Sequence, residues 1–488
     1  MVINLKAIVK ILCAVMAIVG LSMLLPLVVA LLYREFDVAK WFALSAVPVI
    51  VIGILGVKFL PKQDNSILKM RDGFFIVAFT WIVMSLVGCI PFVMTGAIPN
   101  FADAFFETAS GFTTTGSSIL SEIESLPRGI LFWRSFTHWL GGMGVLVLTI
   151  ALLPMLGIGG QKIMRAETTG PTMDKISFTI NRGAQGLYII YTVMTVIEMV
   201  LLMFCGLDLF DASTHAFGTL GTGGFSTYNS SIGAFHNLPA EIIITVFMIL
   251  AGVNFSLYYN MVSGKGLSAF KDPEFKAYIG IVLFMMVFIT AMLTIHKTYS
   301  GFGESLRMSS FTVGSIISST GYAITDYEKW PEVCKLLVLI MMFIGGCGGS
   351  TAGGLKVIRV VVLMKLIKRN VKKRLSPRTV SAIKVGGKEV SEDTLNGIVA
   401  HIGLYAVLCI LGTFIISLTG VDNITSFSSV VTCLSNIGPG FGLIGPTENF
   451  GFYSDFVKYL LSIYMIAGRL EMFTIVILFT RDFWDKNK

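Results

Sequence analysis

Ten apolar runs occupy most of this 488-residue chain and constrain its fold more than any other feature. A helix needs about 20 apolar residues to cross the hydrocarbon core of a bilayer, and each run has roughly that length. Charged residues are only 14% of the chain, against about 25% in soluble domains. We therefore predict an all-α polytopic membrane protein. The runs cover residues 11–32, 41–60, 73–94, 130–156, 188–209, 240–262, 278–295, 334–364, 398–418 and 459–480.

Four short glycine-containing turns lie between pairs of these runs. Each turn follows a segment, such as 101–111, that is too short to cross a bilayer. Backbone that leaves a helix at membrane depth needs protein or water around it, and the carbonyls freed there can replace an ion's hydration shell. With Gly116, Gly223, Gly321 and Gly438 aligned, the turns contain Thr114, Thr115 and Gly116; Thr222 and Gly223; Ser319, Thr320 and Gly321; and Asn436, Ile437 and Gly438.

This recurrence predicts four pseudo-repeated units of helix, pore loop and helix around a central pore. Self-similarity at a roughly constant period is the signature of a repeat architecture. The first two apolar runs contain no such turn and are predicted to form an additional amino-terminal hairpin. The predicted divisions are 1–72 for the hairpin, then 73–182, 183–276, 277–395 and 396–488 for the four repeats.

A glycine-rich stretch interrupts the apolar run 334–364. Glycine costs about 1 kcal/mol relative to alanine inside a helix, so six glycines within ten residues disfavour a continuous helix. We predict two half-helices joined by an irregular, flexible loop that can hold two arrangements. The alternative is close helix packing through small residues. The glycines predicted to form the moving loop are Gly345, Gly346, Gly348, Gly349 and Gly353.

The last apolar run contains two charges, Arg469 and Glu471. Charges inside a membrane helix are costly and mark functional sites by default. A spacing of two residues places these side chains on different faces of one helix, so they are not expected to pair with each other. The alternative is a structural ion pair with another helix, for which Glu198 is a candidate partner of Arg469.

The distribution of the 37 Lys and Arg residues predicts the orientation. Most lie in alternate connecting segments, which the positive-inside rule assigns to the cytoplasm together with both termini. The basic stretch 365–388 follows from this topology, or it holds acidic lipid or a protein partner. The net charge of +8 therefore needs no nucleic acid. Acidic residues near the outward-opening turns either attract cations or are ordinary loop residues: Asp103, Glu107, Asp208, Asp211, Asp326, Asp422 and Glu448.

Several classes of function find no support in the sequence. The seven cysteines show no spacing typical of a zinc site or a disulfide framework. The glycine-rich stretch ends in Leu355 and Lys356, unlike a nucleotide-binding loop. No nucleophile and base are arranged as in an enzyme, and we predict neither catalytic residues nor an organic cofactor.

With its four turns, its glycine-rich break and the segment 467–471, the chain resembles the Trk/Ktr/HKT superfamily of potassium transporters. The amino-terminal hairpin and the total length point to the TrkH/TrkG branch. The fourth turn, around Asn436, departs most from the family pattern. The resemblance implies that potassium is the bound substrate, that the four turns form its selectivity filter and that the glycine-rich loop is a gate, with Arg469 below the filter. It also implies a homodimer in a bacterial inner membrane and a cytoplasmic, nucleotide-binding regulatory subunit of the TrkA type.

The predicted function is channel-like potassium uptake. The alternative is a proton- or sodium-coupled secondary transporter of another solute, a class marked by inverted repeats and by helices broken at matching positions. Here the repeats read as parallel, and only one helix is clearly interrupted. The sequence leaves open whether potassium transport is passive or a symport coupled to protons or sodium.

Overall fold

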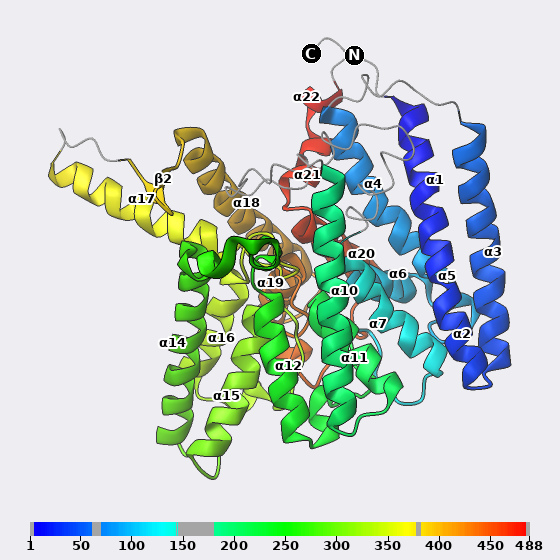
Figure 1. Ribbon diagram of the computed structural model, residues 1–488, viewed down its shortest axis with the longest axis horizontal. Coiled ribbons are helices and arrows are strands. Elements are labelled where there is room, and N and C mark those ends of the chain that lie inside the picture. The colour runs from blue at the N-terminus through cyan, green and yellow to red at the C-terminus, as the bar shows by residue number, and fades with distance from the viewer. Residues whose placement is uncertain (1–3, 61–69, 143, 145–179, 377–381, 485–488) are drawn as a thin grey trace.

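The computed structural model describes residues 4–60, 70–142, 144, 180–376 and 382–484. Helices packed side by side form its body, and the amino-terminal hairpin lies at one edge (Figure 1). In the hairpin, α1 (Leu5–Ser22) and α2 (Leu24–Leu32) run antiparallel to α3 (Phe36–Phe59). Between α2 and α3, the Glu35 carboxylate accepts the backbone N–H groups of Arg128 and Gly129 at 2.7 and 3.0 Å. These bonds fasten the hairpin to the first repeat.

Each repeat begins with a long helix, continues with a short helix and a turn, and then enters a second long segment. The first helices are α4 (Met70–Gly88), extended by α5 (Ile90–Met94), α10 (Ile180–Phe204), α14 (Pro273–Ile295) and α18 (Glu392–Ser417). The short helices are α6 (Phe101–Phe112), α11 (Leu209–Gly221), α15 (Phe302–Ile317) and α19 (Asn423–Ser435). The second segments begin with α7 (Arg128–Gly142), α12 (Leu238–Ala251), α16 (Glu332–Ile344) and α20 (Asp455–Arg469).

The four short helices have a clear origin in the sequence. Three of them begin at a side chain that accepts a backbone N–H of the first turn, namely Asn100, Asp208 and Asp422. Such caps satisfy backbone donors that have no partner within the helix. With 12 to 16 residues and a rise of about 1.5 Å per residue, these helices cannot span a hydrocarbon core of about 30 Å.

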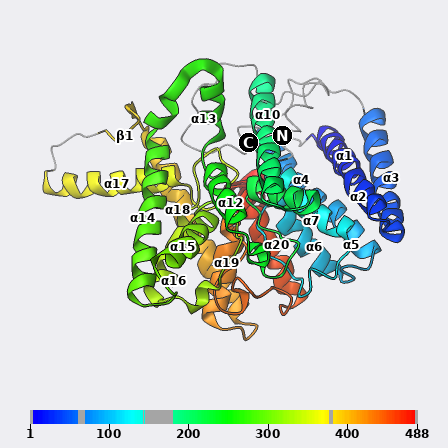
Figure 2. The same cartoon turned by 60° about the horizontal axis from the view of Figure 1, so that its bottom comes forward.

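The repeats close into a ring through the packing of neighbouring units. The second helix of each repeat packs against the short helix of the next: α7 against α11, α12 against α15, α16 against α19, and α20 against α6. Figure 2 shows α12, α15, α19 and α20 close together in the middle of the molecule. Chain order and spatial order therefore agree around the ring. The predicted architecture of four pseudo-repeated units is confirmed.

The second segments are more interrupted than the sequence indicated. The break in 334–364 is confirmed, since α16 ends at Ile344 and α17 (Val357–Leu375) begins at Val357. Two further breaks were not predicted: run 240–262 divides into α12 and α13 (Phe255–Asn260), and run 459–480 bends by 114° between α20 and the segment Phe473–Phe479, which begins with α21 (Phe473–Val476). Of run 130–156, residues 143 and 145–156 lie outside the described residues. Six described helices, or seven with the bent pair, are long and apolar enough to cross a membrane.

The helix α17 extends away from the body of the molecule (Figures 1 and 2). Its base is anchored, because Ile358 and Val362 pack in one buried cluster with Leu395 and Ile398 of α18. Farther along, Arg369 pairs with Glu392 at 2.6 Å. Beyond α17, a two-residue antiparallel pair, β1 (Lys384–Val385) with β2 (Lys388–Glu389), leads into α18. The short helix α22 (Arg481–Trp484) ends the described chain.

Candidate functional site: a ring of four turns above a glycine-rich loop

The four turns share one backbone conformation. The first residue of each has a positive φ, which is 55° at Thr114, Thr222 and Ser319 and 53° at Asn436. Residues other than glycine seldom adopt this region and usually do so where the surroundings fix them. Two positions later comes a glycine of positive φ, a conformation that glycine adopts without steric cost. These glycines are Gly116 (81°), Gly224 (78°), Gly321 (83°) and Gly438 (102°).

This geometry shifts the sequence alignment of the second turn by one residue. Gly224, rather than Gly223, has the conformation of Gly116 and its counterparts. Backbone hydrogen bonds give the same register, since one residue in each turn donates its N–H to the carbonyl five positions earlier. The four bonds are Thr115 to Ser110 (2.9 Å), Gly223 to Gly218 (2.8 Å), Thr320 to Ser315 (2.8 Å) and Ile437 to Thr432 (3.0 Å). We call residues 114–116 the first turn, 222–224 the second, 319–321 the third and 436–438 the fourth.

The turns are in close contact around a closed ring. A Cβ atom placed on Gly116 would overlap the carbonyl oxygen of Gly223, and each later glycine meets the next turn in the same way. Gly224 faces the Thr320 carbonyl, Gly321 that of Ile437, and Gly438 that of Thr115, at 2.9 Å from a Cβ. The carbonyl of each middle residue therefore lies against the glycine of its neighbour. Glycine is therefore required at these four positions for two reasons: the positive φ, and the lack of space for a Cβ atom.

Side chains fasten neighbouring turns to one another. His138 on α7 is fully buried, with Nδ1 2.8 Å from the carbonyl of Gly111 and Nε2 accepting the Phe225 N–H at 3.2 Å. The His138 ring also explains why residue 223 is a glycine, because a Cβ at Gly223 would overlap the ring. The remaining neighbours are joined by Tyr322 Oη to Phe225 O (3.3 Å), Tyr327 Oη to Gly440 O (3.0 Å) and Asn436 Nδ2 to Thr115 Oγ1 (2.8 Å).

One cavity of about 210 Å³ opens above the ring, and all four glycines Gly116, Gly224, Gly321 and Gly438 line it. Glu448 is the only one of the predicted outer acidic residues in this lining. The others have structural partners: Asp103 pairs with Lys458, Glu107 with Arg134 and Asp326 with Lys329, Asp211 accepts from Thr227, and Asp208 and Asp422 cap helices. Of the two interpretations given for these acidic residues, structural roles account for all but Glu448.

Each short helix leads into its turn with its carboxyl-terminal end. Aligned peptide dipoles place a partial charge of roughly −0.5 at such an end. Four helix ends, those of α6, α11, α15 and α19, therefore direct negative potential towards the ring. Together with the turn carbonyls, they make a site suited to a cation that has lost part of its water.

The glycine-rich loop (345–356) joins α16 to α17 and packs against two broken elements. The N–H of Cys347 donates to the Gly252 carbonyl at 2.8 Å, and the Gly349 carbonyl accepts the Phe255 N–H at 3.0 Å, both at the break between α12 and α13. Glu274 on α14 accepts the N–H groups of Gly348 and Ile358 at 2.7 and 3.1 Å. The loop is irregular, as predicted, and these hydrogen bonds connect its backbone to α14 and to the break between α12 and α13.

The far end of this loop reaches the third and fourth repeats. The Gly353 N–H donates to Ser319 Oγ at 2.5 Å, and the Gly354 N–H donates to the Ser435 carbonyl at 3.0 Å. Ser319 begins the third turn, and Ser435 directly precedes the fourth. A Cβ on Gly353 would overlap the Ser435 carbonyl. The loop therefore lies directly against the ring, on the side away from the 210 Å³ cavity.

Arg469 is the last residue of α20 and joins the first repeat to the glycine-rich loop. Its Nη1 donates to the Thr351 carbonyl at 2.8 Å, and its Nη2 donates to the carbonyls of Gly141 and Gly142 at 2.6 and 2.8 Å. The guanidinium also lies 5.8 Å from the centre of the Trp81 ring. Arg469 therefore contacts the glycine-rich loop directly.

The predicted placement of the acidic residues around Arg469 needs correction. Glu471 does not lie on a helix face, because it occupies the break after α20 with a φ of 55°. It pairs with Arg359 at the start of α17. Glu198 on α10 is fully buried, and no described residue forms an ion pair with it. No local pattern indicates the Arg359–Glu471 pair, since 112 residues separate its members.

The chain also matches known proteins over most of its length. Residues 47–486 match the family model TrkH, described as a cation transport protein. The chain is 38% identical over 467 residues to the Trk system potassium uptake protein TrkH of Escherichia coli (strain K12), covering 95% of this chain and 96% of that protein. It is 35% identical to TrkG of the same strain over 468 residues, with the same coverage.

A solved structure shows the same fold. The crystal structure of the potassium transporter TrkH from Vibrio parahaemolyticus superposes with a TM-score of 0.88 at 34% identity, covering 99% of this chain and all of that one. The family model, the full-length relatives and the solved structure therefore indicate the same family. The chain is a multi-pass membrane protein and belongs to the TrkH family of cation transport proteins.

Proposed function

We propose that this protein takes up potassium through the ring of four turns. The observation that carries the proposal is the closed contact of the turns, in which the carbonyls of Thr115, Gly223, Thr320 and Ile437 each meet the glycine of the preceding repeat around the ring. Backbone carbonyls in such a ring can replace the water shell of a potassium ion. The names of the full-length relatives, which are potassium uptake proteins, support the same substrate.

Hydrogen bonds within and between the turns support their role as a selectivity filter. Hydroxyl pairs brace the first and third turns, with Thr113 Oγ1 2.8 Å from Thr115 Oγ1 and Ser318 Oγ 2.7 Å from Thr320 Oγ1. Asn436 braces the fourth by donating to Thr115 Oγ1 and to the Met465 carbonyl at 2.8 and 2.9 Å. A fixed ring of carbonyls discriminates between cations by their size and hydration, whichever of these dominates.

The glycine-rich loop and Arg469 are proposed to close the path on its inner side. A cation leaving the ring inward would meet a loop bonded to Ser319 and Ser435, and the positive charge bonded to Thr351. Opening then requires the loop to leave these partners. Glycines of positive φ at Gly345 and Gly354, 69° and 77°, leave the two ends of the loop free of side-chain obstacles to such a movement.

The secondary-transporter alternative is less well supported than the pore. Three of the four second segments are interrupted. The argument against a secondary transporter from a single interrupted helix is therefore weakened. The packing order of the repeats nevertheless closes a ring in chain order, whereas coupled transporters of that class use inverted repeats around a midplane site. Coupling to protons or sodium can be tested by imposing a gradient of either ion. A coupled transporter would use that gradient to move potassium against the potassium gradient.

Partners of the protein are also part of the proposal. We expect a homodimer in the bacterial inner membrane, with both termini and the basic helix α17 on the cytoplasmic side. A separate nucleotide-binding subunit would act on this side, and neighbouring lipids would contact its basic residues. Neutralising Lys372, Lys373 and Arg374 together should weaken recovery of that subunit in a pull-down, while neutralising Arg34 and Lys40 at the opposite end of the hairpin should not. Equal recovery from both variants would reject α17 as the contact.

The direct test is ion uptake by purified protein in liposomes. Wild-type protein should accumulate potassium or its analogue rubidium in response to a membrane potential and should favour it over sodium. Empty liposomes and liposomes containing an unrelated membrane protein provide the background. Uptake of neither ion above that background, by protein that remains folded and monodisperse, would refute the proposed function.

A further inference from the structure

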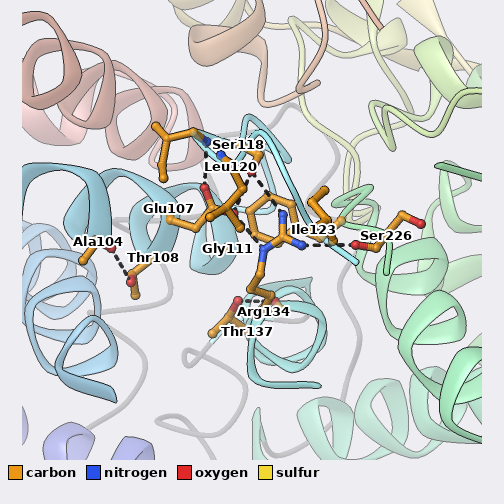
Figure 3. Close-up of polar contacts among 12 residues, drawn as sticks. Ala104, Glu107, Thr108, Gly111, Ser118, Leu120, Ile123, Arg134, Thr137 and Ser226 are labelled. Carbon is orange, nitrogen blue, oxygen red and sulfur yellow. Dashed lines mark hydrogen bonds and ion pairs between the residues drawn. The ribbon is translucent and has the colours of Figure 1, made fainter. Parts of the chain in front are cut away.

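A buried ion pair lies directly behind the first and second turns. Arg134 on α7 and Glu107 on α6 contact each other at 2.8 Å, and their side chains are 1% and 0% exposed. Figure 3 shows the guanidinium of Arg134 lying between Glu107 and Ser226, with Ser118 beside it. Burying two charges is costly unless hydrogen bonds satisfy their remaining donors and acceptors. The partners of this pair are therefore informative about its role.

Arg134 forms hydrogen bonds to equivalent positions of two different turns. Its Nη2 donates to Ser118 Oγ at 3.2 Å, and its Nη1 donates to the Ser226 carbonyl at 3.1 Å. Ser118 lies two residues after Gly116, and Ser226 lies two residues after Gly224. The guanidinium carbon also lies 4.1 Å from the centre of the Phe225 ring, between Gly224 and Ser226. One rigid, planar group thus sets the distance between the outer ends of the two turns.

Glu107 fixes the first turn from the other side. Its Oε1 accepts the Ser118 hydroxyl at 2.9 Å, and its Oε2 accepts the Ile119 N–H at 3.0 Å. The carboxylate thereby connects the short helix α6 to the segment that leaves the turn. Besides bonding to each other, both side chains form hydrogen bonds to groups that lie just after the first and second turns, namely those of Ser118, Ile119 and Ser226.

The corresponding positions of the third and fourth turns are held without a charge. Ala323 exchanges bonds with the second repeat, donating to Ser231 Oγ at 3.2 Å and accepting the Gly233 N–H at 3.2 Å. The Gly440 carbonyl accepts the Tyr327 hydroxyl at 3.0 Å. Among the described contacts at these four positions, the charged brace belongs to the first and second turns alone.

We propose that Arg134, oriented by Glu107, is a positioning residue for cation selectivity. This inference rests on the proposed function, because it assigns to Arg134 the spacing of two turns of the filter. The planar guanidinium can bridge Glu107, Ser118 and Ser226 at once, whereas a lysine ammonium is a point charge without this fork. Arg134 lines the cavity above the ring, and Glu107 balances its charge at 2.8 Å. The role proposed for Arg134 is therefore to set the spacing of the two turns.

Two variants separate this role from a simple contribution to folding. Arg134→Lys keeps the charge that balances Glu107 but loses the bridge between the turns. Arg134→Met with Glu107→Gln removes both buried charges, which avoids leaving either one unpaired. The matched control is Arg307→Lys, since Arg307 makes a bidentate pair with Glu241 at 2.6 Å that joins helices α15 and α12.

The experiment measures the potassium-to-sodium uptake ratio in liposomes and the melting temperature of the same preparations. Both Arg134 variants should keep potassium uptake and lose about tenfold or more in the ratio, the effect of one charge-assisted hydrogen bond. Arg307→Lys should keep the wild-type ratio whether or not its melting temperature falls. A wild-type ratio in both Arg134 variants, a loss equal to that of Arg307→Lys, or failure of both to fold would overturn the inference. Wild-type protein without potassium uptake would instead refute the proposed function itself.

Discussion

Replacing Arg469 by alanine tests how the glycine-rich loop is held closed. The substitution removes three hydrogen bonds, to the carbonyls of Thr351, Gly141 and Gly142 at 2.8, 2.6 and 2.8 Å. It also removes a positive charge from the inner side of the ring. We expect uptake to rise in the absence of any regulatory subunit, because both changes favour an open path.

The size of the effect follows from these contacts. A hydrogen bond to a charged group contributes about 1.5–3 kcal/mol, so losing the bond to Thr351 alone should raise the open fraction roughly 10- to 150-fold. Two unit charges about 4 Å apart repel by roughly 4 kcal/mol at an effective dielectric near 20. Removing this repulsion alone would raise the occupancy of the path by at most about a thousandfold. The bonds to Gly141 and Gly142 stabilise the end of α7 and need not affect the gate.

The assay is rubidium uptake per correctly folded protein in liposomes, with Arg469→Lys as the comparison. Lysine keeps the charge but lacks the planar fork that reaches both sides. If the bond to Thr351 dominates, Lys and Ala should raise uptake alike; if repulsion dominates, only Ala should. A deletion within residues 346–353 should raise uptake further. Uptake at or below wild type in both Arg469→Ala and the deletion, in folded protein, would refute the gate.

Two further sets of substitutions test the ring and the inner ion pair. Replacing Gly116, Gly224 or Gly321 by Ser should lower the potassium-to-sodium ratio, because a Cβ would overlap a neighbouring carbonyl; unchanged ratios in all three liposome preparations would remove the filter assignment. Glu471→Gln should lower the melting temperature in detergent by leaving Arg359 without its countercharge, at a cost of about 1–3 kcal/mol, and Arg359→Met should restore part of it. No loss of stability in Glu471→Gln would show that this pair contributes nothing.

Periodic features of the sequence predicted the architecture well. The alternation of long apolar runs with short segments determines which helices span and which stop halfway, because the bilayer thickness sets the required length. The cluster of six glycines likewise predicted the break before α17, where helix propensity is lowest. These are local properties that the order of residues contains directly.

Other features depend on contacts that no local pattern reveals. The break after α12 occurs at Gly252, a single glycine in an apolar run, and it is stabilised by a bond from Cys347 almost a hundred residues later. The sequence alignment matched Gly223 to the other three glycines, whereas the adjacent Gly224 has their conformation. The backbone conformation, the turn hydrogen bonds, the His138 ring and the neighbouring carbonyls distinguish the two glycines, and the local sequence reveals none of them.

The Arg134–Glu107 pair illustrates the same limit. In the sequence, Arg134 resembles an interfacial residue at the start of a span, and Glu107 resembles one of several outer carboxylates. Folding brings them together behind two turns, where each is buried. Acidic residues near the turns thus proved to be caps and ion-pair partners, because helix ends and buried cations compete for the same carboxylates.

The central claim is that a cation is held by the carbonyls of the ring, and locating a bound cation tests it most directly. Thallium, a potassium analogue with strong anomalous scattering, can be soaked into crystals of the purified protein. The account predicts a thallium peak on the axis of the ring, coordinated by carbonyl oxygens of Thr115, Gly223, Thr320 and Ile437. Thallium bound only among side chains at the helix breaks, with an empty ring at saturating concentration, would contradict it.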